Sequence, residues 1–441
     1  MPSTVAAPPA HSPRCGSGTD VFQTKRYAAP PTRRRRADAE VTPARPGRIW
    51  PLLGPAFVTA VAYVDPGNFA TNIAAGSGYG YLLVWVVVVS NIMAMLIQYL
   101  SAKAGVATGL SLPALCREHL PRPVVRGLWG QAELVAVATD LAEVVGGALA
   151  LKLLFDLPLL VGGTITAVVA FALLAVKGAG HRHFETVIIG LLGVILVGFA
   201  YDIAISGVDA MAVLDGTLPR FEGIDSVVLA AGMLGATVMP HAIYLHSALT
   251  SERLHARTDA ARRTVMRGQR IDVVTAMTIA GLMNLSLLLV AASALSGRGI
   301  DTIEGAYAGL GETLGTGAAL LFALGLLASG FASSSVGTLS GQVVMEGFLR
   351  RRVPLTVRRL VTLLPALVVL SLGVDPTAAL VASQVVLSFG IPFALVPLVW
   401  FTARRDVMGS LVNRRVTTVA GVAAAGAIIV LNVVLLVQLA T

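Results

Sequence analysis

Charged side chains are scarce in this 441-residue chain: they make up 13% of it, while 55% of the residues are hydrophobic. A soluble domain carries about 25% charged residues, so the chain has too few to cover a water-facing surface. Apolar runs such as 82–100 and 417–439 have the roughly 20 residues that one membrane span needs. The scarcity of charge therefore excludes an ordinary soluble protein and predicts an all-α integral membrane protein.

Cysteines and the common catalytic motifs are also few or missing. The two cysteines, Cys15 and Cys116, have no partner at metal-ligand spacing and make no disulfide framework, so both are expected to be free thiols. There is no His-Glu-x-x-His zinc motif, and no nucleophile motif frames the Ser and His residues of the spans, which argues against an intramembrane protease. A nucleotide-driven pump is not expected either, because no Gly-x-x-x-x-Gly-Lys-Ser/Thr loop is present. The sequence predicts neither an enzyme nor a bound cofactor.

Acidic residues are outnumbered, with 24 against 33 basic ones and a net charge of +9. The basic residues lie between apolar runs rather than on one soluble face, so they indicate membrane topology and not a nucleic-acid partner. Residues 1–46 are rich in Pro, Ala, Arg and Ser and lack the apolar core of a signal peptide. They are predicted to form a disordered basic cytoplasmic tail. Its run Arg33–Arg36 is interpreted as a solvated topology anchor, with a specific lipid or partner site as the alternative.

Eleven spans are expected in a transmembrane domain over 47–441. They lie near 52–76, 81–100, 128–152, 157–176, 185–205, 226–249, 271–296, 308–346 (long, and expected to include a loop), 358–373, 378–402 and 416–439. The segments after the even-numbered spans are basic, whereas the segment after the fifth span is acidic. Because cytoplasmic loops collect Lys and Arg, the N-terminus is predicted to be cytoplasmic and the C-terminus extracytoplasmic, in the plasma (inner) membrane.

Two spans contain a proline beside functional side chains. The first span reads Ala-Tyr-Val-Asp-Pro-Gly-Asn at 62–68, and the sixth reads Ala-Thr-Val-Met-Pro-His at 236–241. Proline removes a backbone hydrogen bond, so each span is predicted to split into two half-helices, with an ordinary kink as the alternative. The second copy comes five spans after the first, an odd number, so the repeats (about 50–205 and 224–403, with an extra helix at 416–439) are inverted. Paired interrupted spans point to the central site of a transporter.

The side chains at these breaks suit a divalent transition metal. Asp65 is a carboxylate within an apolar span, which is a functional site by default, and Asn68 is near enough to share a ligand with it. Oxygen ligands alone would suit magnesium or calcium, but the thioether of Met239 at the second break favours softer ions. Plain packing is the alternative role for Met239.

Acidic residues in the third span provide a candidate proton pathway. Glu133, Asp140 and Glu143 are seven and three residues apart, so they share one helical face that cannot point to lipid. A proton wire is the favoured interpretation. Structural ion pairing with Arg358 and Arg359, which begin the ninth span, is the alternative.

Further polar residues follow the second break and lie in other spans. His241 and His246 could carry a proton, since an imidazole titrates at about pH 6.5, or they could be structural. Because they are five residues apart, they are expected to have separate roles. Gln384 in the tenth span is a candidate metal ligand. Gln98 and Asn284 are buried amides that could simply bond a neighbouring helix.

Together these residues resemble the Nramp family of divalent metal transporters. The similarity rests on Asp-Pro-Gly-Asn at 65–68, Met-Pro-His at 239–241 and Tyr-Leu-His-Ser at 244–247, and it extends from about Pro51 to the C-terminus. The resemblance implies a LeuT-like fold of two inverted five-helix repeats with helices 1 and 6 discontinuous. It implies as metal ligands Asp65, Asn68, Met239, the carbonyls of Ala62 and Ala236, and, when the site closes, Gln384.

The resemblance also implies a reaction and a metal preference. The third-span acids and the arginine pair would carry a co-transported proton, and the methionine is missing from magnesium- and aluminium-transporting relatives. Many members have Asn where this chain has Ala242, a position not expected to bind metal. The expected protein is a monomeric proton-coupled importer of Mn²⁺ or Fe²⁺, and also Co²⁺ or Cd²⁺, in the lipid bilayer. One alternative function is a sodium-coupled amino-acid transporter, but Asp65 would repel the carboxylate of such a substrate. A channel is another alternative, but the matched halves favour alternating access.

Overall fold

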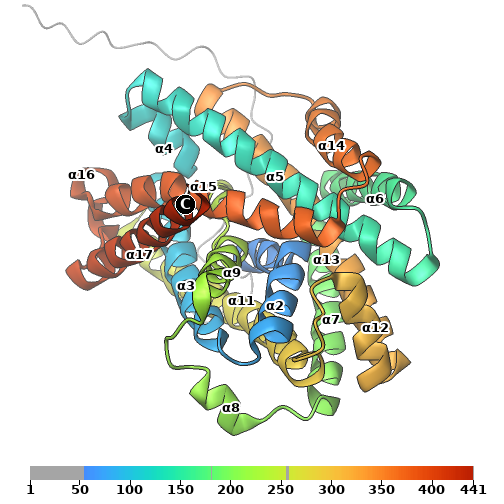
Figure 1. Cartoon of the computed structure of the whole chain (residues 1–441). Helices are drawn as coiled ribbons and strands as arrows, with labels where there is room; N and C mark the ends of the chain where they lie inside the picture. Colours follow the sequence, from blue (N-terminus) through green and yellow to red (C-terminus); the bar gives the residue numbers. More distant parts are fainter. Residues whose placement is uncertain (1–53, 180, 255–257, 441) are drawn as a thin grey trace, which may run out of the picture. The chain divides into compact units, whose positions relative to one another are not determined.

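The computed structural model describes residues 54–179, 181–254 and 258–440, all of which belong to one compact unit. The tail 1–46 and Cys15 lie outside the described residues. No strand occurs among the described residues, and the helices follow one another as in Figure 1. They are α1 (Pro55–Ala60), η2 (Val61–Val64), α2 (Pro66–Tyr79), α3 (Val84–Thr108), α4 (Leu112–His119), α5 (Arg122–Phe155), α6 (Leu159–Ala179), α7 (His181–Ile205), α8 (Ala210–Asp215), α9 (Gly223–Thr237), α10 (Pro240–Arg253), α11 (Asp259–Ala294), α12 (Ile303–Thr313), α13 (Thr316–Leu349), α14 (Leu355–Ser371), α15 (Pro376–Ala403), α16 (Arg405–Met408), η3 (Gly409–Leu411) and α17 (Arg415–Ala440).

Each of the eleven predicted spans corresponds to helices of the structure. Within the described ranges, eight helical segments are long and apolar enough to cross a membrane; one of them is the α9–α10 pair. The remaining predicted spans are the interrupted α1–η2–α2 segment, α6 and α14. The prediction of an all-α membrane protein with about eleven spans is confirmed.

The eighth predicted span contains the expected loop, although its first helix begins earlier than predicted, at Ile303. The stretch 308–346 is two helices, because α12 ends at Thr313 and α13 begins at Thr316. Gly315 between them has φ 97°, a conformation that favours glycine. The short helices α4, α8 and α16 lie between spans and were not predicted.

The two predicted breaks are present, and each begins a helix with a proline. Asp65 is extended (φ −85°, ψ 169°) and caps α2, whose first residue is Pro66. Met239 is likewise extended (φ −81°, ψ 121°) before Pro240, the first residue of α10. Proline suits this first helical position because its missing N–H would have no intrahelical partner there.

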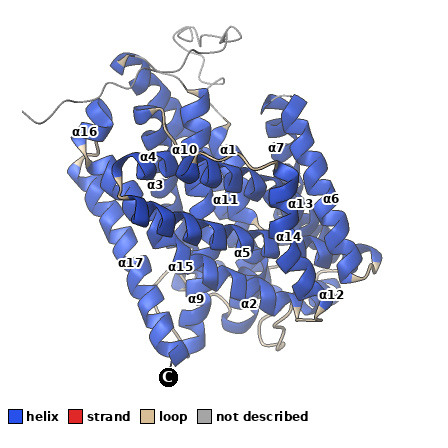
Figure 2. Ribbon diagram, turned by 90° about the horizontal axis from the view of Figure 1, so that it is seen from above, coloured by secondary structure: helices blue, strands red, loops and turns tan. Residues whose placement is uncertain are grey.

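The half-helices of the two breaks run in opposite directions. Figure 2 places α1 and α10 toward one end of the bundle, with α4 and α16, and α2 and α9 toward the other end. The chain enters the first break from α1 and the second break from α9, so the interrupted spans are antiparallel, as an inverted repeat requires. Helices α11, α13 and α15 pack around them, and α5 packs along α13 and α15.

Candidate functional site

The first break holds a carboxylate whose two oxygens differ. Asp65 Oδ1 accepts hydrogen bonds from the backbone N and from Nδ2 of Asn68, both at 2.8 Å. Asp65 Oδ2 accepts none from the described residues, although the side chain is only 1% exposed. A buried carboxylate oxygen without a donor is costly, so this atom is available for a cation or a proton.

Asn68 joins the two breaks. Its Nδ2 donates to Asp65 and also to the carbonyl of Ala236, 2.9 Å away at the end of α9. Both of those oxygens only accept, so the amide nitrogen must face them and Asn68 Oδ1 points elsewhere. Asn68 Oδ1 has no donor among the described groups. The predicted neighbours Asp65, Asn68 and Ala236 therefore do lie together.

Gln384 of α15 lies directly against the first break. A Cβ atom on Gly67 would be 1.8 Å from Gln384 Nε2, and one on Gly235 would be 2.2 Å from the Gln384 carbonyl oxygen. Both glycines thus permit a close approach of α15. Gln384 Nε2 donates to Ser383 Oγ at 3.2 Å, while Gln384 Oε1 accepts no bond from the described residues.

The site therefore gathers three buried acceptor oxygens that lack donors in the part of the chain that the structure describes, on Asp65, Asn68 and Gln384. Only one of them carries a formal charge. Met239 is fully buried immediately before Pro240, and Ala62 is buried in η2. The ligand roles of Met239 and Ala62 stay predictions.

Side chains from other helices satisfy several carbonyls near the breaks. Asn284 Nδ2 of α11 donates to the Tyr63 carbonyl at 2.6 Å, and Ser329 Oγ of α13 donates to the Val64 carbonyl at 2.6 Å. Ser340 Oγ does the same for the His241 carbonyl at 2.7 Å. These residues hold the backbone of the interrupted helices. The sequence predicted such a role only for Asn284, as a buried amide that could bond a neighbouring helix.

His246 and His241 have separate surroundings; their separate roles stay a prediction. His246 Nδ1 lies 2.6 Å from Gln98 Oε1, and Gln98 Nε2 donates to the Tyr63 hydroxyl at 2.5 Å. Because Gln98 Oε1 can only accept, His246 carries its proton on Nδ1 in this network. His241 instead meets α5, where its Nδ1 lies 3.4 Å from Thr139 Oγ1.

The acids of α5 divide into two ion pairs and one unpaired group. Glu133 accepts two bonds from Arg358, at 2.7 and 3.1 Å. Asp140 pairs with Arg359 at 3.4 Å. Both oxygens of Glu143 have no hydrogen-bond partner among the described residues, and the side chain is 1% exposed. Ion pairing, the alternative interpretation, thus holds for Glu133 and Asp140. The role of Glu143 in proton transfer stays a prediction.

Arg359 is completely buried and has more than one partner. Its Nη1 donates to the Ser334 carbonyl at 2.9 Å, and its guanidinium also bonds the hydroxyls of Ser334 and Thr338. Arg359 is therefore held by the serine-rich stretch of α13 as well as by Asp140.

Two buried acids were not predicted from the sequence. Asp272 of α11 accepts bonds from the backbone N of Gly54 at 3.0 Å and of Ala56 at 2.9 Å, so it caps α1. Asp202 of α7 is 1% exposed, and neither of its oxygens has a partner among the described residues. A carboxylate inside an apolar span was the available signal for both.

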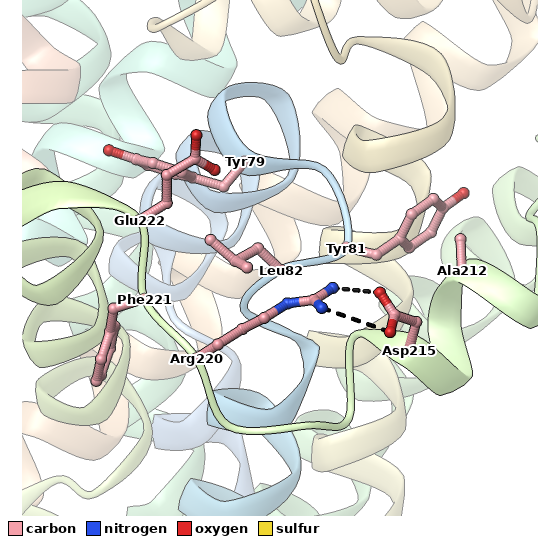
Figure 3. Close-up of a pocket in the computed structure, with 8 residues that line it drawn as sticks. All are labelled: Tyr79, Tyr81, Leu82, Ala212, Asp215, Arg220, Phe221 and Glu222. Carbon is pink, nitrogen blue, oxygen red and sulfur yellow. Dashed lines mark hydrogen bonds and ion pairs between the residues drawn. The ribbon is translucent and has the colours of Figure 1, made fainter.

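The acidic segment after the fifth span forms local structure at the far ends of α2 and α9. Asp209 caps α8, and Asp215 pairs with Arg220. Figure 3 shows this ion pair within a cavity of about 510 Å³ that Tyr79, at the end of α2, and Glu222, before α9, also line. The cavity therefore lies beside the C-terminal end of α2 and the N-terminal end of α9, which are the ends far from the breaks.

Cys116 of α4 is the cysteine that the structure describes. It is free and buried, and burial raises the pKa of its thiol to about 12. A thiol that stays protonated is a poor metal ligand, which agrees with the absence of a thiolate from the predicted site.

Comparisons with known proteins assign the chain to a family. Residues 56–438 match the family described as natural resistance-associated macrophage protein-like, or Nramp. The chain belongs to the Nramp family. The divalent metal cation transporter MntH of Bacillus subtilis is 52% identical to this Nramp protein over 393 residues, which cover 88% of the chain and 92% of the relative. The MntH of Mycobacterium tuberculosis is 54% identical over 392 residues, covering 88% and 91%.

Solved structures agree with the observed fold. The manganese transporter of Eremococcus coleocola has a TM-score of 0.79 at 33% identity, covering 87% of this chain and 85% of that one. A nucleobase-cation-symport-1 family transporter shares the fold alone, with a TM-score of 0.59 at 16% identity. This Nramp protein is therefore a multi-pass membrane protein of a transporter family, with the predicted LeuT-like architecture.

Proposed function

We propose that this Nramp protein imports divalent transition metals, Mn²⁺ or Fe²⁺ and also Co²⁺ or Cd²⁺, together with protons. The cation is the transported substrate and no resident cofactor is required. The observation that carries this proposal is the group of three donor-free buried oxygens, on Asp65, Asn68 and Gln384, where the two breaks meet. A cation satisfies several acceptor oxygens at once, whereas a neutral solute would have to bring a donor for each one.

The single charge of the site suits alternating access. One carboxylate, Asp65, balances only half the charge of a divalent ion, so the ion is held by neutral oxygens and can leave. Asn68 bonds both Asp65 and the Ala236 carbonyl, so a ligand that engages Asn68 acts on both interrupted helices. The Ala62 and Ala236 carbonyls would join the ligands as the half-helices move.

Protons would follow a separate route through α5. His241 lies after the second break and meets Thr139, next to Asp140. Glu143, whose oxygens have no hydrogen-bond partner within the described ranges, lies one helical turn beyond Thr139, and Asp140 and Glu133 hold Arg359 and Arg358. We assign proton movement to Asp65, His241, His246, these three acids and the two arginines.

The basic segments favour a cytoplasmic N-terminus and an extracytoplasmic C-terminus in the plasma membrane. In that orientation α1 and α10 lie toward the cytoplasm, and α2 and α9 lie toward the outside. The matched halves need no second subunit, so we propose a monomer in the bilayer.

Manganese uptake into proteoliposomes tests the proposal. Asp65→Asn keeps the size of the side chain but removes the only formal charge among the ligands, so uptake should be abolished while the protein stays monodisperse. Asp301→Asn, at an exposed position, is the matched control and should transport normally. Near-normal uptake by Asp65→Asn would remove Asp65 from the centre of the site, and metal uptake without acidification of the vesicles would contradict proton coupling.

Metal competition tests the assigned role of Met239. A thioether replaces an oxygen poorly for Ca²⁺ or Mg²⁺ and well for Cd²⁺. Met239→Ala should therefore let Ca²⁺ or Mg²⁺ compete with Mn²⁺ uptake and should weaken Cd²⁺ binding most. If Met239 only fills space, all metals lose affinity equally and their rank order stays unchanged.

A further inference from the structure

The helix that carries Gln384 has a defect in its backbone hydrogen bonding one turn further on. In an α-helix the carbonyl of residue i accepts the N–H of residue i+4, and for Ser388 that residue is Pro392, which lies inside α15. Proline has no N–H to donate. A buried carbonyl needs another donor, so the Ser388 carbonyl must be satisfied from outside its own helix.

Asn432 of α17 supplies the missing donor. Its Nδ2 lies 2.8 Å from the Ser388 carbonyl oxygen, and its Oδ1 lies 2.9 Å from Ser388 Oγ. The carbonyl can only accept, so it fixes the orientation of the amide. Asn432 is 6% exposed, within a helix that turns Val430 and Val433 outward at 63% and 53% exposure. Asn432 therefore faces α15 and uses both ends of its amide.

The turn that Asn432 supports is pressed against the second break. A Cβ atom on Gly235 would be 2.2 Å from the Gln384 carbonyl oxygen and 2.9 Å from Ser388 Cβ. Gly235 directly precedes Ala236, whose carbonyl bonds Asn68. The segment from Gln384 to Ser388 thus lies between α9 on one side and Asn432 on the other.

We propose that Asn432 is a positioning residue for the metal site: it replaces the backbone donor that Pro392 removes and so holds the turn of α15 that places Gln384 against Gly67. This inference rests on the proposed role of Gln384 as a metal ligand. A bond from a side chain on another helix can break and re-form as α15 moves, which a continuous helical ladder does not allow. The eleventh span, which lies outside the two five-helix repeats, thereby acts on the transport site.

The concentration dependence of Mn²⁺ uptake by the full chain in proteoliposomes measures this role. Asn432→Leu keeps a similar volume but leaves the Ser388 carbonyl without a donor. It should raise KM for Mn²⁺ by about fivefold or more, because an unsatisfied buried carbonyl disfavours the arrangement seen here. Leu435→Ala removes packing at a buried position of the same helix and should leave KM within about twofold.

A second change separates positioning from general loss of stability. Pro392→Ala restores the backbone donor, so the double variant Asn432→Leu/Pro392→Ala should recover the KM of the native chain. If Asn432→Leu alone is not recovered as folded protein, recovery of the double variant with native KM supports the proposal, and its failure overturns it.

Coupling to Gln384 gives the deciding readout. In a Gln384→Ala background, Asn432→Leu should change KM by less than about twofold, because residues that act through one group are not additive. The same fold-change in both backgrounds, or a native KM for Asn432→Leu, would overturn the positioning role. These outcomes differ from failure of the proposed function, in which Asp65→Asn itself would still transport Mn²⁺.

Discussion

A single methyl group at Gly67 tests whether Gln384 must touch the first break. In Gly67→Ala the new Cβ would lie 1.8 Å from Gln384 Nε2, 2.2 Å from Cδ and 2.8 Å from Cγ. An ordinary contact needs about 3.4 Å, so the amide must retreat by about 1.6 Å. The atoms concerned are at the far end of a flexible side chain, and α2 itself gains helix propensity from the alanine. The protein should therefore fold while its Gln384 is displaced.

The size of the effect follows from the cost of overpacking. Extra volume in a packed interior costs about 1–3 kcal/mol. If this cost falls only on the arrangement in which Gln384 contacts Gly67, that arrangement becomes about 5- to 150-fold less populated, since each 1.4 kcal/mol is tenfold. We expect KM for Mn²⁺ to rise within this range and the thermal stability in detergent to change little.

The control is a glycine that can accept a methyl group. A Cβ on Gly232 would lie 3.5 Å from Thr71 Cγ2, which is ordinary contact, so Gly232→Ala should have nearly native KM. Combining Gly67→Ala with Gln384→Ala removes the clash, and this double variant should behave like Gln384→Ala alone. A KM within twofold of native for Gly67→Ala would refute the reasoning, because the close approach would then have no role in binding.

Two further predictions concern the buried acids. Asp140→Asn leaves the charge of Arg359 without its carboxylate. Proton flux, measured with a pH dye inside proteoliposomes, should therefore fall more than Mn²⁺ binding does. Native proton flux would make Asp140 a structural partner only. Asp272→Asn leaves one of the two backbone N–H groups at the start of α1, at Gly54 or Ala56, without an acceptor. The free energy of unfolding in detergent should therefore fall by about 1–3 kcal/mol. An unchanged Tm would show that this cap does not hold α1.

The local chemistry of the breaks was predictable from sequence. Proline removes a backbone hydrogen bond, and Asp65 and Met239 directly precede prolines in apolar runs, so the positions of the breaks follow from the sequence. Their antiparallel sense follows from counting the spans. The pairing of Arg358 and Arg359 with the acids of α5 was one of two alternatives, since an intramembrane charge must find a partner.

Contacts between distant helices were not predictable in the same way. The approach of Gln384 to Gly67, and of Asn432 to Ser388, depends on how α15 packs, and hydropathy carries no information about packing. The length of 308–346 indicated a loop within it, but hydropathy did not give the place at which α12 ends and α13 begins.

The arginine pair of α14 has a consequence for how the chain is assembled during synthesis. This helix has 17 residues, and each arginine adds about 2.5–3.5 kcal/mol to the cost of inserting a segment when it lies near the segment centre, and less near an end. Glu133 and Asp140 offset that cost only if α5 is already in the bilayer. Because α5 is translated first, its carboxylates are already in the bilayer when α14 is synthesised. The insertion of the ninth span therefore depends on the third span. The yield of membrane-integrated Asp140→Asn protein measures that dependence; an undiminished yield would mean that α14 inserts unaided.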